Sequence, residues 1–175
     1  MADGQPTGPW VGLAVTLAIQ AMVSMALLSF PVMAPEVARE LGLPTAWIGA
    51  YVSLAYLGAM MSSLAGGAAV RRLGAIRVSQ WGLVACAAGL GLCMLPSAAA
   101  IACGAWLIGI GYGPATPASS HLLARTTPAH RMSLVFSVKQ TGVPLGGMLA
   151  GLMLPPVALT LGWRWAVGLV AVLAL

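Results

Sequence analysis

The sequence contains very few charged residues. Of its 175 residues, three are Asp or Glu and eight are Lys or Arg, so that 6% are charged while 60% are hydrophobic. Roughly a quarter of the residues in a typical soluble domain are charged. A water-soluble core formed by a chain of this length could not absorb so much apolar sequence. The composition therefore excludes a soluble globular protein and predicts a membrane protein that crosses the bilayer several times.

The groups that enzymes need are also scarce. No Asp or Glu lies within the long apolar runs, so these runs lack the paired carboxylates of acid–base catalysis. Ser119, Ser120 and His121 are adjacent, but neighbours on a helix do not face each other and so cannot form a nucleophile–base pair. Cys86, Cys93 and Cys103 have no metal-ligand spacing and are expected to be small apolar side chains. The sequence thus predicts no enzyme, no cofactor and no bound metal.

Long uncharged runs divide the chain into six predicted transmembrane helices, which indicates an all-α membrane protein. Prolines mark the expected helix ends: Pro31 and Pro35 after the first span, Pro96 between the third and fourth, and Pro155 with Pro156 after the fifth. The last span would be only about 16 Å long, so we expect the sequence to be truncated within it. The predicted spans are 10–33, 46–65, 78–95, 98–123, 133–154 and an incomplete 165–175.

Positive charge collects at the boundaries of the spans. No basic run with interleaved aromatic residues is present, so the net charge of +5 does not predict nucleic-acid binding. The stretch 66–77 is expected to form a tight basic hairpin, and 125–131 a second basic loop. Because short basic loops stay in the cytoplasm, the charges predict a cytoplasmic N-terminus, in what we expect to be a bacterial cytoplasmic membrane. This orientation places five arginines inside (Arg71, Arg72, Arg77, Arg125, Arg131) and two outside (Arg39, Arg164).

Polar residues form a stripe along the first predicted span. Thr16, Gln20 and Ser24 recur every four residues and therefore share one face of the helix. This polar stripe either joins two helices through hydrogen bonds or faces a polar cavity, and the sequence favours neither alternative.

The fourth predicted span is interrupted by glycine and proline over 109–117. A membrane tolerates such an interruption only where protein or a water-filled cavity can satisfy the freed backbone groups. Tyr112 and Thr116 lie at helical spacing within this stretch. We therefore expect the fourth span to contribute polar groups to a site inside the membrane.

Lys139 lies inside the fifth predicted span, about 12 Å along the helix from Arg131. An intramembrane lysine costs roughly 2.5–3.5 kcal/mol on insertion scales, and such groups usually face a cavity or a partner. No acidic residue within the spans is available as that partner. Gly142 and Gly146 share the face of the lysine, which predicts an open wall beside it. We expect Lys139 to bind an anionic group; the alternative is a side chain that snorkels back to the interface.

Between the second and third predicted spans lie Gly67, Arg72, Gly74 and Arg77. Their spacing resembles a signature of the major facilitator superfamily. That signature has a glycine, three further residues, an aspartate, a basic residue, one further residue, a glycine and then basic residues. The matching positions are Gly67, Arg72, Gly74 and Arg77. Arg71 occupies the usual aspartate position, and in the family this aspartate helps to hold the two halves of the transporter together.

A second motif, in the fifth span, is similar to the antiporter motif of the same family, Gly-Pro-x-x-Gly-Gly. The matching residues are Gly142, Pro144, Gly146 and Gly147, with Val143 inserted between the first two. The resemblance implies that residues 1–175 form six transmembrane helices in two three-helix repeats. This unit would be the N-terminal half of a twelve-helix transporter, whose C-terminal six-helix half is missing from this chain. Substrate sites of such transporters lie near the middle of the membrane, often on interrupted helices.

These features together predict a secondary active transporter in the lipid bilayer. Its cargo is expected to be a small anionic solute, carried by alternating access with or without a coupling ion. Lys139 would supply the positive charge, and Gln20, Tyr112 and Thr116 would form hydrogen bonds to the substrate. Two alternatives stay open: an antiporter that exports drugs or other amphipathic solutes, and a membrane scaffold that transports nothing.

Overall fold

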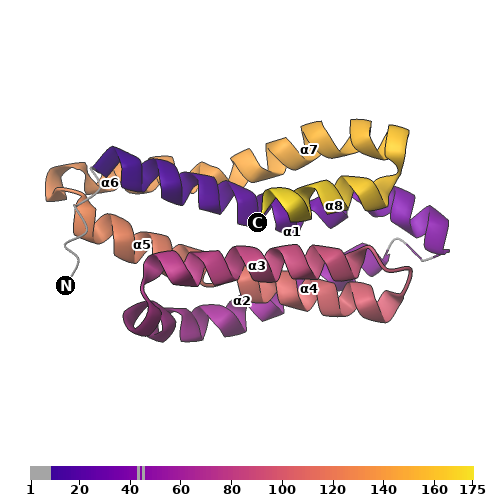
Figure 1. Cartoon of the computed structure of the whole chain (residues 1–175), viewed down its shortest axis with the longest axis horizontal. Helices are drawn as coiled ribbons and strands as arrows, with labels where there is room; N and C mark the ends of the chain where they lie inside the picture. Colours follow the sequence, from indigo (N-terminus) through magenta and orange to yellow (C-terminus); the bar gives the residue numbers. More distant parts are fainter. Residues whose placement is uncertain (1–8, 43, 45) are drawn as a thin grey trace.

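The computed structural model describes residues 9–42, 44 and 46–175, and within these ranges every regular element is helical (Figure 1). This confirms the predicted all-helical class. The elements are α1 (Pro9–Leu41), α2 (Ala46–Leu73), α3 (Ala75–Cys93), α4 (Ala98–Tyr112), α5 (Ala115–Thr126), the short 3₁₀ helix η1 (Ala129–Arg131), α6 (Met132–Gln140), α7 (Gly142–Leu161) and α8 (Trp163–Leu173).

Five helical segments of the described chain are long and apolar enough to cross a membrane. α1, α2 and α3 are each one segment, α4 with α5 form the fourth, and η1 with α6 and α7 form the fifth. α8 is equally apolar but has 11 residues. Large apolar side chains such as Leu64, Trp81 and Leu159 are exposed on the surface of the bundle, where a membrane protein would meet lipid or another helix.

The helices lie side by side with their axes roughly parallel or antiparallel, as Figure 1 shows. α1 packs along α7, while α4 packs against both α2 and α3. α5 contacts α1, α2 and α3, and α8 contacts α1, α3 and α7. These two shorter helices therefore connect the α1–α7 pair with the group formed by α2, α3 and α4. The largest buried cluster, which includes Met25, Tyr51, Leu90, Ile108 and Trp163, draws side chains from α1, α2, α3, α4, α5, α7 and α8.

Small residues allow the helices to approach closely. A Cβ atom added to Gly109 of α4 would lie only 2.0 Å from the backbone oxygen of Ala55 in α2, so no other residue fits there without movement of a helix. Between α3 and α4, the buried thiol of Cys86 donates to the carbonyl oxygen of Ile108 at 3.6 Å. Cys86 is therefore the small buried side chain that the sequence predicted.

Glycine ends several helices by adopting a positive φ. The φ angles of Gly42, Gly74 and Gly162 are 63°, 85° and 91°. This left-handed conformation reverses the chain, and glycine reaches it without the steric clash that a Cβ would cause. Each of these glycines directly follows a long helix, so the membrane-spanning segments are separated by very short connections.

The predicted basic hairpin over 66–77 is wrong in its extent. α2 continues to Leu73 and α3 begins at Ala75, so that Gly74 alone forms the connection. Arg71 and Arg72 consequently lie in the last turn of α2. Cations are favourable at this position because the carbonyl end of a helix carries partial negative charge. A single glycine can reverse the chain here, which is why the helix need not stop at residue 65.

Two of the predicted proline stops are also wrong. Pro31 and Pro35 lie inside α1, which continues to Leu41, and Pro155 and Pro156 lie inside α7, which continues to Leu161. A proline removes one backbone hydrogen bond, but neighbouring helices and hydroxyl side chains can compensate in a membrane protein. The carbonyl oxygens that lose their donors in α7 are those of Gly151 and Leu152, four residues before the two prolines.

The other connections are closer to the prediction. Pro96 lies in the turn between α3 and α4, as expected. The second basic connection is shorter than 125–131, because α5 continues to Thr126 and η1 begins at Ala129. α8 begins at Trp163, two residues before the predicted start of the sixth span.

Two long segments are interrupted in mid-course. α4 ends at Tyr112 and α5 begins at Ala115, so the predicted interruption within 109–117 is confirmed. The second interruption, at Thr141 between α6 and α7, was not predicted. Pro144 explains it, because its ring excludes the carbonyl oxygen four residues earlier, that of Gln140, from the usual helical position.

Candidate functional site

The interrupted fifth segment runs beside α1 and in the same direction. A Cβ atom added to Gly142 would lie 2.9 Å from the Cβ of Gln20, and one added to Gly146 would lie 2.7 Å from the Cβ of Ser24. Lys139 precedes Gly142 by about one turn and is on the same face of the segment. The contact between α1 and α6–α7, here called the α1–α7 seam, therefore brings Lys139 and Gln20 to neighbouring levels.

Lys139 is 1% exposed. Its Nζ atom donates to Oε1 of Gln140 at 3.2 Å, and no carboxylate of the described chain forms an ion pair with it. Glu36 and Glu40 are the described acidic residues, and Glu36 is about 24 Å along α1 from Gln20. An ammonium group buried without a counter-charge is unfavourable. The described residues thus leave this charge without compensation.

The polar stripe faces the same seam. Thr16, Gln20 and Ser24 are all buried. Thr16 Oγ1 donates to the backbone oxygen of Gly12 at 2.8 Å, within its own helix. Oε1 of Gln20 and Oγ of Ser24 have no hydrogen-bond partner among the described residues. The amide oxygen of Gln20 can therefore accept a hydrogen bond from another group, and the hydroxyl group of Ser24 can donate or accept one.

The prediction of an open wall beside Lys139 is wrong. Gly142 and Gly146 are buried, because α1 occupies the space that their missing side chains leave. Gly147 is partly buried and faces Leu28, whereas Pro144 is exposed and produces the break before α7. The glycines of this motif therefore hold α1 and α7 close together.

Tyr112 and Thr116 come from the other interrupted segment. Tyr112 is half-buried at the end of α4, and its ring meets the ring of Tyr56 edge to face, with centroids 6.5 Å apart. Thr116, in the first turn of α5, is exposed. The hydroxyl group of Tyr112 lies near the side chain of Ser24 in α1. Lys139 and Gln20 thus lie along the α1–α7 seam, Tyr112 lies beside Ser24 of the same seam, and Thr116 is exposed.

The four residues of the loop signature surround the turn between α2 and α3. Gly67 lies within α2, Arg72 in its last turn, Gly74 at the turn itself and Arg77 in the first turn of α3. Both arginines are exposed, so the turn has a positively charged surface.

A cluster at the opposite end of the bundle was missed by the sequence analysis. Glu40, at the end of α1, accepts hydrogen bonds from Nε1 of Trp163 and from Nη1 of Arg164, both at 2.5 Å. Arg164 Nε also donates to the backbone oxygen of Met94 at 3.1 Å. This Glu40 cluster ties α1 to α8 and to the end of α3. In the sequence, this cluster was indicated only by the opposite charges of Glu40 and Arg164, which lie at the ends of two spans on the same predicted side of the membrane.

Tyr51 of α2 was also missed. It is 1% exposed, and its ring stacks on that of Phe30 with centroids 4.6 Å apart. Its hydroxyl group has no hydrogen-bond partner within the described residues. A tyrosine near the start of an apolar span usually indicates a membrane interface, so no pattern in the sequence indicated that Tyr51 would be buried in the core.

Five long apolar segments are typical of a polytopic membrane protein. The interrupted helices and the buried lysine are features with which such a protein could bind a polar solute. The sequence model of the Major Facilitator Superfamily matches residues 13–175, and the chain therefore belongs to this family of membrane transporters. The family resemblance found in the sequence is confirmed, and with it the assignment as an integral membrane protein.

A relative supports the same class. The chain is 28% identical over 135 residues to the "Putative metabolite transport protein YwtG" of Bacillus subtilis (strain 168). The match covers 77% of this chain and 30% of the relative, so this chain spans only about a third of the length of that protein. The family and the relative together support a transporter.

Proposed function

We propose that this chain is the N-terminal half of a secondary active transporter that carries a small anionic solute by alternating access. Its six helices would form two three-helix repeats and would pack against a second six-helix half. The limited share of the relative that the chain matches supports this arrangement. We place the protein in a bacterial cytoplasmic membrane with its N-terminus in the cytoplasm, because the arginines at the Gly74 turn favour that side.

The burial of Lys139 without a carboxylate partner is the observation that carries the proposal. An anionic solute would supply the opposite charge in a region of low dielectric, where the attraction between charges is strong. Gln20, through its amide nitrogen, and Ser24, through its hydroxyl group, which is unpaired within the described chain, would donate hydrogen bonds to the same solute. Tyr112, which lies near Ser24, and Thr116 would form further hydrogen bonds to the solute.

The test is uptake of radiolabelled small carboxylates and of inorganic phosphate into proteoliposomes that contain the complete transporter. Lys139→Ala should lose uptake through a large rise in the half-saturating concentration, because the positive charge is gone. Lys139→Arg should be intermediate, since it keeps the charge but not the compact ammonium group. Arg131→Ala is the matched control: it removes an exposed positive charge eight residues earlier and should leave uptake unchanged.

A snorkelling lysine predicts a different result. Removing it would be harmless or slightly stabilising, because its insertion cost disappears. An unchanged concentration dependence in Lys139→Ala, at equal protein level, would therefore refute the anion proposal.

A further inference from the structure

Two tyrosines meet at the surface of the bundle, and we call them the tyrosine pair. Tyr56 of α2 and Tyr112 of α4 have ring centroids 6.5 Å apart, with the ring planes inclined by 79°. Tyr112 is half-buried, whereas Tyr56 is 51% exposed. An edge-to-face contact of this kind covers one face of only one of the two rings. The tyrosine pair therefore has aromatic surface left for a third ring.

The position of the tyrosine pair along its helices is unusual. Tyrosines of membrane proteins gather near the two membrane–water interfaces, at the ends of the spans. Tyr56 lies ten residues, or about 15 Å, beyond Ala46 at the start of α2. Tyr112 lies fourteen residues, or about 21 Å, beyond Ala98 at the start of the fourth segment. These segments have 28 and 29 residues, so both tyrosines lie well inside them and the interfacial role does not explain them.

Close backbone contacts hold the tyrosine pair in place. A Cβ atom added to Gly58 of α2 would lie 2.6 Å from the backbone oxygen of Trp106 in α4. One added to Gly113, just after Tyr112, would lie 3.0 Å from the backbone nitrogen of Ser63 in α2. The two helices are therefore fixed against each other next to both tyrosines. A ligand that binds to such a preorganised pair loses little affinity to the ordering of side chains.

The tyrosine pair adjoins the unpaired polar groups of the α1–α7 seam. The hydroxyl group of Tyr112 lies near the side chain of Ser24. Gln20 lies one turn, or about 6 Å, before Ser24 on α1, at a level next to that of Lys139. α1 contacts α6 and α7 as well as α4, and α4 contacts α2. The residues from Lys139 to Tyr56 thus follow one another from a positive end through a polar middle to an aromatic end.

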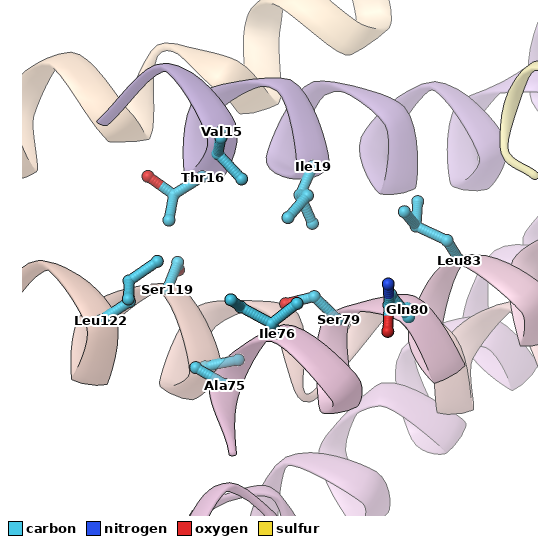
Figure 2. A pocket seen from close by; sticks show the side chains of 11 residues that line it. Val15, Thr16, Ile19, Ala75, Ile76, Ser79, Gln80, Leu83, Ser119 and Leu122 are labelled. Carbon is cyan, nitrogen blue, oxygen red and sulfur yellow. The ribbon is translucent and has the colours of Figure 1, made fainter. Parts of the chain in front are cut away.

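A groove elsewhere on α1 has a different character. It measures about 210 Å³, lies between α1, α3 and α5, and is lined largely by apolar side chains such as Val15, Ile19 and Leu83 (Figure 2). Neither the tyrosine pair nor Lys139 and its polar neighbours on α1, Gln20 and Ser24, line this groove. The groove is therefore not where these five residues could meet one solute.

We propose that the solute of this protein is an aromatic carboxylate, whose carboxylate group binds at Lys139 and whose ring packs against Tyr112 and Tyr56. This inference rests on the proposed function, because Lys139 supplies the opposite charge. One helical turn separates the level of Gln20 from that of Ser24, which suits a single ring that carries a carboxylate. Contacts between aromatic rings add to the affinity beyond the area that they bury, by about two- to tenfold for one pair.

Calorimetric titration of the purified complete transporter tests this inference with two acids of the same charge and similar size. Benzoate is aromatic and cyclohexanecarboxylate is not, so we expect benzoate to bind about two- to tenfold more tightly. Tyr112→Leu and Tyr56→Leu should each lower this preference, whereas Tyr112→Phe should keep it because the ring remains. The matched control is Trp81→Leu, which removes a 67% exposed ring from α3 and should leave the preference unchanged.

Equal binding of the two acids, or no binding of benzoate, would overturn the inference. It would also be overturned by a preference that persists in both Tyr112→Leu and Tyr56→Leu. Tyr56→Leu changes an exposed side chain, so it decides the question even where Tyr112→Leu fails to fold.

Lys139→Ala and two neutral probes separate this inference from the anion proposal. Lys139→Ala should weaken both acids alike and leave the preference for the aromatic one. Benzamide and cyclohexanecarboxamide carry no charge, so their binding should not depend on Lys139. A preference for benzamide, with acids that bind no more tightly than amides, would support the aromatic contact and refute the anion proposal. Equal binding of the two acids that is lost in Lys139→Ala would support the anion proposal and refute the aromatic contact.

Discussion

The contact between α1 and α7 should be very sensitive to a single methyl group at Gly146. A Cβ atom at this position would lie 2.3 Å from the backbone oxygen of Ala21 and 2.7 Å from the backbone nitrogen of Met25. Both neighbours are main-chain atoms, so no side-chain rotation can relieve the clash. Gly146→Ala therefore requires that α1 and α7 move apart by about 1 Å, which would loosen the packing beside Lys139.

Two opposing effects set the size of the change. Alanine is favoured over glycine inside a helix by about 1 kcal/mol. Overpacking of a tight contact usually costs about 1–3 kcal/mol. Gly146→Ala should therefore be neutral to destabilising by about 2 kcal/mol. Gly151, five residues further along α7, has no atom within 4 Å of an added Cβ, so Gly151→Ala should gain the helical preference without the clash.

The assay is thermal unfolding of the two purified variants in the same detergent, compared with the parent chain. We expect the free energy of unfolding of Gly146→Ala to lie about 1–3 kcal/mol below that of Gly151→Ala. The comparison removes helix propensity, because both substitutions occur in one helix and replace the same residue. Equal stability of the two variants would show that α1 and α7 are not held as closely as the structure indicates, and would refute the reasoning.

Three further predictions concern the ends of the bundle. Glu40→Gln should lower the free energy of unfolding by about 1 kcal/mol, because charged hydrogen bonds are lost. The control is Glu36→Gln, which removes an exposed ion pair of 3.9 Å to Arg39 and should change the free energy of unfolding by less than about 0.5 kcal/mol. Equal effects of the two substitutions would contradict the role of the Glu40 cluster. Gly74→Ala should cost about 1–2 kcal/mol in the same assay because its φ is 85°. In intact cells, an impermeant thiol reagent should label a cysteine at Arg39 but not one at Ala129, and the reverse pattern would overturn the proposed orientation.

The all-helical class and the long apolar segments could be predicted from the sequence because both follow from composition. Long apolar runs without charge have few other ways to satisfy their backbone groups in a membrane. The ends of the helices could not be predicted equally well. Pro31 and Pro155 suggested stops, yet each lies within a continuous helix, because neighbouring packing compensates for one missing hydrogen bond. Three of the reversals occur instead at Gly42, Gly74 and Gly162, which have a positive φ. No sequence pattern distinguishes these glycines from the many glycines that serve in helix packing.

The candidate site was predictable only in part for a related reason. Lys139 was identifiable because a charge inside an apolar span is rare and costly. What surrounds it depends on how the helices pack. Gly142 was expected to leave space beside the lysine, but a glycine in a membrane helix equally permits a neighbouring helix to approach, and here α1 does so. The contact of Glu40 with Arg164 likewise joins residues 124 positions apart, which the spans alone cannot reveal.

The interruption at Thr141 lies two residues after Lys139, so the buried charge is next to a point where the fifth segment can bend. α7 is fastened to α1 through the buried glycines at 142 and 146, whereas α6 ends at Gln140 and is separated from α7 by Thr141 alone. Pro144 cannot donate the hydrogen bond that would otherwise join the two helices into one rigid rod. A change of angle between α6 and α7 therefore costs fewer hydrogen bonds here than within an unbroken helix. In the proposed transporter, an anion attracted to Lys139 would bind directly beside this joint. If the anion bound one angle between α6 and α7 more tightly than another, its binding would favour that angle while α1 and α7 stay in contact. A small solute could in this way shift the position of α6.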